Sequence, residues 1–331
     1  MRKIIECVPN FSEGRNPGTI KKITDEIKKV ERVKLLNIES DRDHNRTVVT
    51  FVGEPPAIKK AAFLAIKKAG ELIDMSLHKG GHPRMGATDV CPFVPLKGAT
   101  MGDCVKLARE LGREVGQKLG IPVYLYEEAA QNPARKKLED IRRGEYEVLA
   151  AKLKLKKWKP DYGPAKFNRK AGATVIGARE FLIAFNVNLK SRDANFAKAV
   201  AGIIRESGAI REIGRGQKIR IPGVFKFVKA IGMDLQGGEL VQISMNLTNY
   251  KITPMHLVYE TIKRIAELKK IKIHSSEIVG LIPQDALLMS GKFYSPKTQS
   301  ARDLIGIAVR QMMLGGFKRF IPENKIIERM I

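Results

Sequence analysis

The chain has 331 residues, 44% of them apolar, which suits one large domain or two of ordinary size. It lacks a long uninterrupted apolar run, and this argues against a membrane span. The net charge of +25 has three competing explanations: a nucleic-acid partner, a small polyanionic ligand, or the lysine-rich composition of some heat-adapted organisms.

The three cysteines are scattered along the chain, and none forms a Cys-x-x-Cys pair. This spacing indicates neither a zinc knuckle nor a disulfide framework. At the N-terminus, Glu6 comes too early for the apolar core of a secretory signal. We therefore expect a cytoplasmic protein.

The first half alternates strand and helix patterns in the order β-α-β-β-α-β. Asn16 and Pro17 are typical of a helix start, and Ile20, Ile23 and Ile27 form one apolar stripe behind them. We expect strands at 3–8, 33–38, 46–52 and 89–96, and helices at 16–29 and 55–73.

The second half repeats this order. Ser191 and Asp193 are candidate helix caps, Thr253 and Pro254 start another helix, and glycines 237–238 suit a hairpin turn. We expect strands at 181–189, 224–235, 240–247 and 276–282, helices at 191–204 and 253–268, and a basic glycine-rich connection at 208–216.

This order is that of the split β-α-β unit of ferredoxin-like folds, an antiparallel sheet with helices on one face. Two such sheets in one chain can face each other, and the space between domains is a common ligand site. We therefore predict an α/β (α+β) protein with two ferredoxin-like subdomains, 1–178 and 179–331, whose sheets face each other across a substrate tunnel.

Further elements lie between and after the two repeats. Residues 135–170 are markedly basic, with Tyr146, Trp158, Tyr162 and Phe167 interleaved. We expect a helix at 100–119, a strand at 122–126, mostly helix at 136–155 and 300–331, and a loop from 161 to 174.

The segment 74–93 concentrates unusual residues between a helix and a strand. Pro83 pushes His82 towards an extended backbone, and neighbouring glycines allow turns. A histidine held there suits acid/base catalysis, because its usual pKa is about 6.5. The alternative is a surface or structural histidine. His78 and His82 have the i, i+4 spacing of zinc sites, but the intervening glycines argue against a helix, so we expect no metal.

Two more polar clusters, 8–16 and 39–47, fall at strand ends. They have ordinary alternatives, a helix-capping turn and a solvated hairpin tip. The sequence has no P-loop, no G-x-G-x-x-G word and no nucleophile elbow, which argues against nucleoside triphosphate and dinucleotide chemistry.

Several long words of the sequence resemble glutamate formimidoyltransferase, and they occur in the right order over essentially the whole chain. They are ECVPNFSEG (6–14), NRTV (45–48), LIDM followed by HKGGHPRMGA (72–75 and 78–87), VCPF (90–93), PVYLY (122–126), RGEYE (143–147), GATV (172–175) and FLIAFNVNL (181–189).

The resemblance implies transfer of a formimino group from N-formimidoyl-L-glutamate to N5 of tetrahydrofolate, a step of histidine catabolism. It implies two α/β subdomains enclosing a tunnel, a homodimer, and tetrahydrofolate as co-substrate without metal. The cyclodeaminase that is fused to the transferase in animals is not expected here.

The resemblance also places functional residues. The catalytic histidine falls on His82. The folate-binding loop falls on Gly163, Pro164, Ala165, Lys166, Phe167, Asn168, Arg169, Lys170, Ala171 and Gly172, which is more basic than the family pattern. Glu39 stands where the family often has Asp.

Chemistry suggests further substrate-binding candidates. Arg46, Arg84 and Lys97 could bind substrate carboxylates. Asn10, Glu39 and Asp89 could orient His82 or the cationic amidine. A basic groove would also attract the glutamate tails of folates.

Two alternatives stay open. One is formyl transfer from N-formylglutamate to the same folate nitrogen, which sequence cannot separate from formimino transfer. The other is a nucleic-acid-binding protein with aromatic platforms on ferredoxin-like sheets. No such signature is visible on the expected strands, so we expect no nucleic-acid partner and no membrane.

Overall fold

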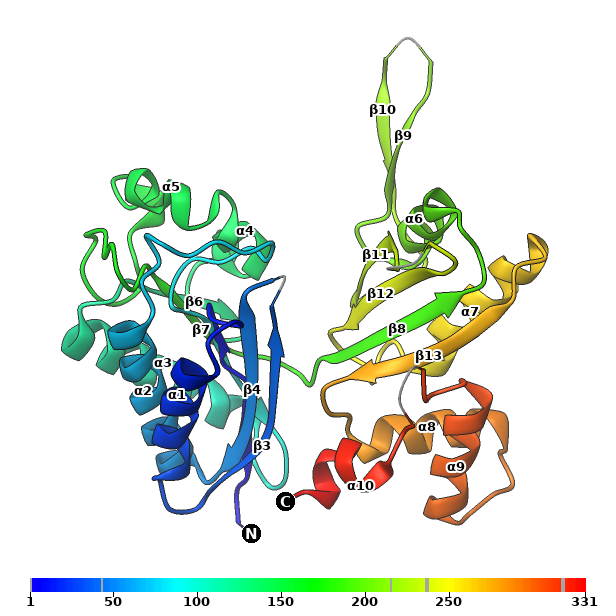
Figure 1. The fold of residues 1–331 in the computed structure, drawn as a ribbon, viewed down its shortest axis with the longest axis horizontal. Coiled ribbons are helices and arrows are strands. Elements are labelled where there is room, and N and C mark those ends of the chain that lie inside the picture. Colours follow the sequence, from blue (N-terminus) through cyan, green and yellow to red (C-terminus); the bar gives the residue numbers. More distant parts are fainter. Residues whose placement is uncertain (1, 43, 215, 236–237, 317–318) are drawn as a thin grey trace. The chain divides into compact units, whose positions relative to one another are not determined.

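The computed structural model describes residues 2–42, 44–214, 216–235, 238–316 and 319–331. It divides into two compact units, Met1–Glu180 (unit 1) and Phe181–Ile331 (unit 2). Each unit combines helices with a β-sheet (Figure 1), so the expected α/β class is confirmed.

Unit 1 contains a seven-stranded sheet in the order β3-β4-β1/β2-β5-β7-β6. The short strands β1 and β2 both lie between β4 and β5. Its strands are β1 (Ile5–Cys7), β2 (Asn10–Phe11), β3 (Val33–Asp41), β4 (Arg46–Gly53), β5 (Thr88–Pro95), β6 (Val123–Glu127) and β7 (Thr174–Ala178). Strand β7 was not expected; it pairs in parallel with both β5 and β6.

Three long helices pack against unit 1's sheet: α1 (Pro17–Lys28), α2 (Pro55–Leu72) and α3 (Met101–Leu119). Asn16 caps α1 by accepting hydrogen bonds from two backbone amides of its first turn. Thr100 and Asp103 form a capping box at the start of α3. The apolar sides of these helices and of the sheet form the main core, in which Ile23, Ile27 and their neighbours are fully buried.

The other face at the β5-β7-β6 end is covered by short helices, α4 (Leu138–Arg142) and α5 (Glu145–Lys152). Val90, Tyr124 and Val175 project to this second core, because strand side chains alternate between faces. We expected one mostly helical segment at 136–155. Gly144, with φ 84°, divides it in two.

Part of the basic stretch has a structural use that charge alone does not reveal. The Arg135 guanidinium bonds the Asp161 carboxylate at 2.8 Å, with both side chains largely buried. Lys152 is buried too and donates to the carbonyls of Ile141 and Arg143 at 2.5 and 3.0 Å. These cations stabilise unit 1 rather than facing a ligand.

Unit 2 contains a four-stranded antiparallel sheet in the order β11-β12-β8-β13. Its elements in chain order are β8 (Ile183–Leu189), α6 (Ala194–Ile204), β11 (Val228–Asp234), β12 (Val241–Leu247), α7 (Met255–Leu268) and β13 (Ile273–Val279). If the four strands are numbered 1 to 4 in chain order, they lie side by side in the sheet in the order 2-3-1-4. Strands β3, β4, β1/β2 and β5 of unit 1 have the same arrangement.

Three features of unit 2 differ from expectation. The connection at 208–216 contributes to a hairpin, β9 (Ala209–Glu212) with β10 (Lys218–Ile221), because its glycines serve the turn while isoleucines alternate with charges beside them. Helix α8 (Gln284–Tyr294) was not expected. The last strand ends at Val279, before Gly280 with φ 75°.

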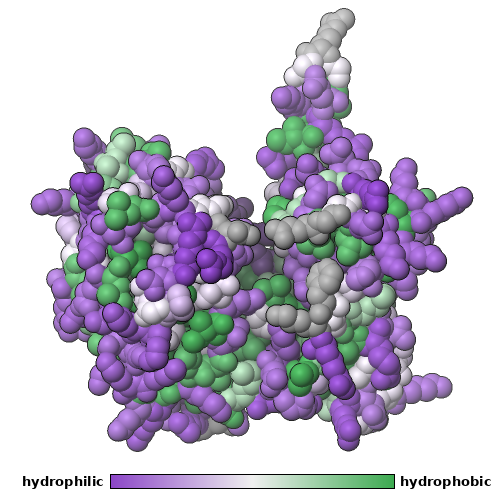
Figure 2. Space-filling model, viewed as in Figure 1, coloured by the Kyte–Doolittle hydropathy of each residue, from purple (hydrophilic) through white to green (hydrophobic). Residues whose placement is uncertain are grey.

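The tail contains α9 (Ala301–Gln311), α10 (Pro322–Lys325) and a 3-10 turn, so its mainly helical character is confirmed. The β9-β10 hairpin extends away from the rest of unit 2, and its surface is partly hydrophobic and partly hydrophilic (Figure 2). Gly237, expected in a hairpin turn, lies outside the described residues.

Candidate active site

The segment 74–93, which was singled out from the sequence, is fastened at Gly86 and Ala87 to the loop 163–172. The Ala87 amide donates to the Ala171 carbonyl at 2.9 Å, and Gly86 and Gly172 form a β-bridge. Both glycines are needed there. A Cβ on Gly86 would lie 2.3 Å from the Ala173 carbonyl oxygen, and one on Gly172, where φ is 67°, would lie 2.2 Å from the Met85 oxygen. The expected catalytic segment and the expected folate loop are therefore joined.

His82 contacts Arg46, the first residue of β4. The Arg46 Nη1 donates to His82 Nε2, since a guanidinium has no acceptor. The other ring nitrogen, Nδ1, is buried and has no hydrogen-bond partner among the described residues. Burial, followed by the charges of Arg46 and Arg142, lowers the pKa of His82 to about 3. The imidazole is therefore neutral near pH 7.

Three candidates project from one sheet face. Arg46 and Val48 pair with Asp41 and Glu39 across β3, and Asn10 pairs with Val48. Directly paired residues share a face, so Arg46, Glu39 and Asn10 lie on the same side of the sheet. Glu39 is exposed, and Asn10 donates to the Val8 carbonyl at 3.0 Å.

Asp89 bonds residues around His82. It is 2% exposed, accepts a hydrogen bond from the Met85 amide at 2.9 Å, and forms an ion pair with Arg142 of α4. Because Arg142 also depresses the pKa of His82, Asp89 influences the histidine by holding this neighbouring cation.

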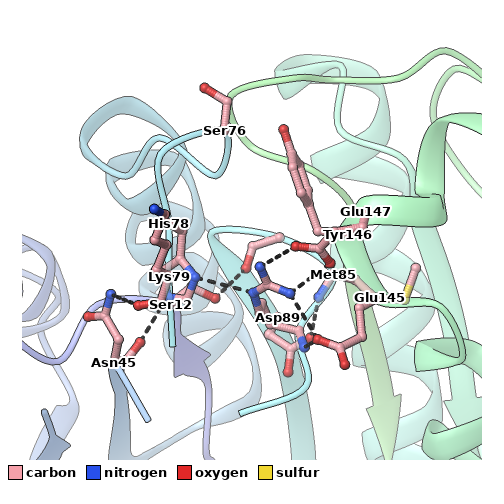
Figure 3. A network of polar contacts seen from close by, with 12 residues as sticks. Ser12, Asn45, Ser76, His78, Lys79, Met85, Asp89, Glu145, Tyr146 and Glu147 are labelled. Carbon is pink, nitrogen blue, oxygen red and sulfur yellow. Dashed lines mark hydrogen bonds and ion pairs between the residues drawn. The ribbon is translucent and has the colours of Figure 1, made fainter. Parts of the chain in front are cut away.

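Asn45 is a residue that we did not single out from the sequence. Its backbone has φ 48°, a conformation that asparagine tolerates better than most residues. Its side chain accepts from the Gly14 amide at 2.9 Å and donates to the Lys79 carbonyl at 3.0 Å, while its own carbonyl accepts from His78 Nε2 at 3.1 Å. Figure 3 shows this connection. Asn45 thereby joins three segments immediately before Arg46.

Arg84 is already occupied by two carboxylates. Its guanidinium bonds Glu145 at 2.9 Å and Glu147 at 2.5 and 2.9 Å, and its Nε donates to His78 Nδ1 at 3.2 Å (Figure 3). This geometry does not favour the carboxylate-binding role that we expected. A cleft of about 620 Å³ opens beside it and is lined by Ser76, His78, Lys79, Gly80, Arg84, Gly144, Glu145 and Glu147.

The structure does not bring Lys97 to this cluster. Asp89 lies near the start of β5 and Lys97 beyond its end. At about 3.3 Å per residue, they are roughly 25 Å apart along the strand. Lys97 therefore lies apart from the other candidates in unit 1.

The loop 163–172 is partly exposed but anchored. The Tyr146 hydroxyl donates to the Arg169 carbonyl at 2.5 Å, and its ring lies 5.4 Å from that of Phe167. Lys170 Nζ donates to the Glu71 carbonyl at 2.6 Å. Asn168 Oδ1 accepts from the Ala171 amide. Lys166 and Arg169 have exposed side chains beside these anchors.

Within the described ranges, no three His, Cys, Asp or Glu side chains are grouped so that they could hold a metal ion. Nor does any described helix combine the length and apolarity that crossing a membrane requires.

Two α/β units have a matching strand order, and the first contains the histidine–arginine contact, so the fold is that of a two-unit α/β protein. Residues 4–179 match the N-terminal subdomain of the formiminotransferase domain, and residues 184–331 match the remaining formiminotransferase domain. The chain belongs to the formiminotransferase domain family.

Relatives of two kinds are similar to it. Glutamate formimidoyltransferase of Thermoplasma acidophilum is 47% identical over 88% of this chain and 92% of its own length, and that of Streptococcus pyogenes is 42% identical over 89% and 94%. The formimidoyltransferase-cyclodeaminase of Dictyostelium discoideum is 43% identical over the whole chain, which spans 61% of that protein.

Proposed function

We propose that this protein is a glutamate formimidoyltransferase. It transfers the formimino group from N-formimidoyl-L-glutamate to N5 of tetrahydrofolate, giving 5-formimidoyltetrahydrofolate and L-glutamate, a reaction of histidine degradation and one-carbon metabolism. Support comes from the family and from relatives of that name at 42–47% identity over most of their length. Tetrahydrofolate is a co-substrate, and the chemistry requires no metal.

The observation that carries this proposal is the partly buried His82–Arg46 contact. During transfer, the attacking N5 amine loses a proton and the departing glutamate nitrogen gains one. One neutral histidine can accept the first proton and deliver it as the second. Holding both substrates in place supplies much of the remaining acceleration.

Arg46 would link substrate binding to the proton carrier. A substrate carboxylate bound by Arg46 would draw the guanidinium away from Nε2 and offset its charge. Both changes raise the pKa of His82, because the Arg46 charge contributes to lowering it. The histidine would thus become a better base when the substrate is present.

The remaining predictions fit around this centre. The shared strand arrangement of the two units supports the ferredoxin-like interpretation. The substrate tunnel expected between two subdomains stays a prediction. The loop 163–172 would bind folate, and Glu39 and Asn10 would orient the amidine. A homodimer in the cytoplasm stays a prediction.

The test is turnover of N-formimidoylglutamate with tetrahydrofolate by wild type and His82→Ala, followed through acid-induced methenyl-folate absorbance. We expect the variant to lose about 10²–10⁴-fold in kcat while still binding folate. Leu77→Ala is the control, since Leu77 is 78% exposed in the same segment. Full activity in His82→Ala would contradict the assigned residue. If wild type turned over N-formylglutamate but not N-formimidoylglutamate, the formyl donor would be favoured instead.

A further inference from the structure

Unit 2 has a second polar cluster on its own sheet. Along β8, Phe185, Val187 and Leu189 are buried in the core. On β11, Gly232 belongs to the same face, since it pairs with Ile243, which pairs with Val187. A Cβ on Gly232 would lie 2.2 Å from the α6 backbone, so α6 presses against that face.

The opposite face carries amides and a carboxylate on β8, β12 and β13, beside the apolar Ile231 and Met233 on the edge strand β11. Strand alternation and cross-strand pairing place the polar side chains together on it. We call them the amide face: Asn186, Asn188, Gln242, Ser275 and Glu277.

The members of the amide face bond one another. Asn186 Nδ2 and Gln242 Nε2 both donate to Glu277 Oε1, at 3.2 and 3.3 Å. Gln242 Nε2 also donates to Asn188 Oδ1 at 2.9 Å, and Asn188 Nδ2 donates to Ser275 Oγ at 3.1 Å. A carboxylate only accepts when ionised, which fixes the direction of the Asn186 and Gln242 amides.

The hydrogen bonds within the amide face use the amide N–H groups, and several acceptor atoms remain without a donor. Glu277 Oε2, Asn186 Oδ1 and Gln242 Oε1 accept no hydrogen bond from any described residue. None of the three is among the fully buried atoms without a partner, so each keeps some exposed surface, although Asn186 and Gln242 as whole residues are only 8% and 6% exposed. In a protein of net charge +25, this patch is an acceptor-rich site with a negative charge.

We propose that the amide face binds a planar N–C–N group carrying two N–H donors, one donating to Glu277 Oε2 and the other to a neighbouring amide oxygen, Asn186 Oδ1 or Gln242 Oε1. The bond to the carboxylate is charge-assisted and therefore the stronger of the two. The inference rests on the proposed function, under which two ligand parts have this chemistry: the 2-amino-N3 edge of the pterin, and the formamidinium of the donor. The carboxylates of either substrate would be repelled by Glu277.

The experiment measures binding separately from turnover. Tetrahydrofolate and N-formimidoylglutamate are each titrated calorimetrically into wild type, Glu277→Gln and a control, Glu239→Gln. Glu239 is an exposed carboxylate of the same unit that pairs with Arg192. Glu277→Gln keeps the shape of the side chain and replaces one acceptor oxygen by a donor.

We expect Glu277→Gln to weaken one of the two ligands by about 10–100-fold, the usual effect of losing a charge-assisted hydrogen bond, while the control binds both normally. Weaker folate binding identifies the pterin edge, and weaker donor binding identifies the amidinium. Unchanged binding of both ligands by a folded Glu277→Gln protein would overturn the inference. Wild type that binds both ligands without turnover would overturn only the proposed reaction, and wild type that binds neither would overturn both.

Discussion

At the scale of single residues, the charge of His82 is controlled by its neighbours. The pKa of His82 is lowered to about 3 by burial and by Arg46 and Arg142, whereas the unfolded chain has a histidine pKa of about 6.5. As pH falls from 6.5 towards 3, the unfolded state binds this proton first. This histidine therefore makes the folded state less stable across that window.

Removing the Arg46 charge should narrow the pH range over which His82 makes the folded state less stable. Arg46→Gln removes the second largest cause of the lowered pKa, so the pKa of His82 should rise towards 6.5 but stay below it, because burial remains. A histidine NMR titration would measure this, with Arg302→Gln on α9 as control. An unchanged titration of His82 in Arg46→Gln would show that the contact has no electrostatic effect in solution.

His82 could be singled out from the sequence because Pro83 and the glycines constrain its backbone locally. The ion pairs of Arg84 could not be predicted in this way. Its partners Glu145 and Glu147 lie some sixty positions away on α5, so only the fold reveals that its charge is already paired. Asn45 was missed for a similar reason, because each of its side-chain bonds reaches a different segment.

At the scale of elements, the bridge between Gly86 and Gly172 fastens the loop 163–172 to the segment 74–93. Gly172→Ala should destabilise unit 1 by two additive effects, a left-handed backbone and a clash with the Met85 carbonyl. Gly120 provides the matched control, because its φ is 63° and nothing lies within 4 Å of the added Cβ.

We expect Gly120→Ala to lower the free energy of unfolding by about 1–2 kcal/mol through backbone strain alone. Gly172→Ala should lower it by roughly 2 kcal/mol more. Urea unfolding would measure both, and limited proteolysis would report exposure of the loop. An equal loss of unfolding free energy in the two variants would mean that the Gly86–Gly172 bridge adapts to the added methyl group and does not hold the loop in place.

Most helices and strands of each unit could be predicted, because caps and apolar periodicity are local signals. The hairpin β9-β10 was hidden by glycines and charges that indicate a connection. Strand β7 was hidden differently. Thr174–Ala178 is short, and its role depends on partners β5 and β6 that lie far away in the sequence.

At the scale of the whole molecule, the charge of +25 should act on ligands at long range, even though Arg135 and Lys152 are used internally. Folates with several glutamates should have a severalfold lower KM than monoglutamates at low salt, and about 0.5 M salt should remove most of this advantage by screening. Steady-state kinetics with both folates at two ionic strengths would measure it. An advantage that persists at high salt would indicate specific contacts instead of general attraction.

The position of β7 has a consequence for how the protein is made. Strands β5 and β6 are synthesised first, but neither is a neighbour of the other in the sheet, since β7 lies between them. Until Thr174–Ala178 leave the ribosome, both strands present unpaired backbone edges, which favour association between chains. Unit 1 thus completes its sheet only with its last strand, and translation that stalls before residue 174 should yield nascent chains that depend on chaperones.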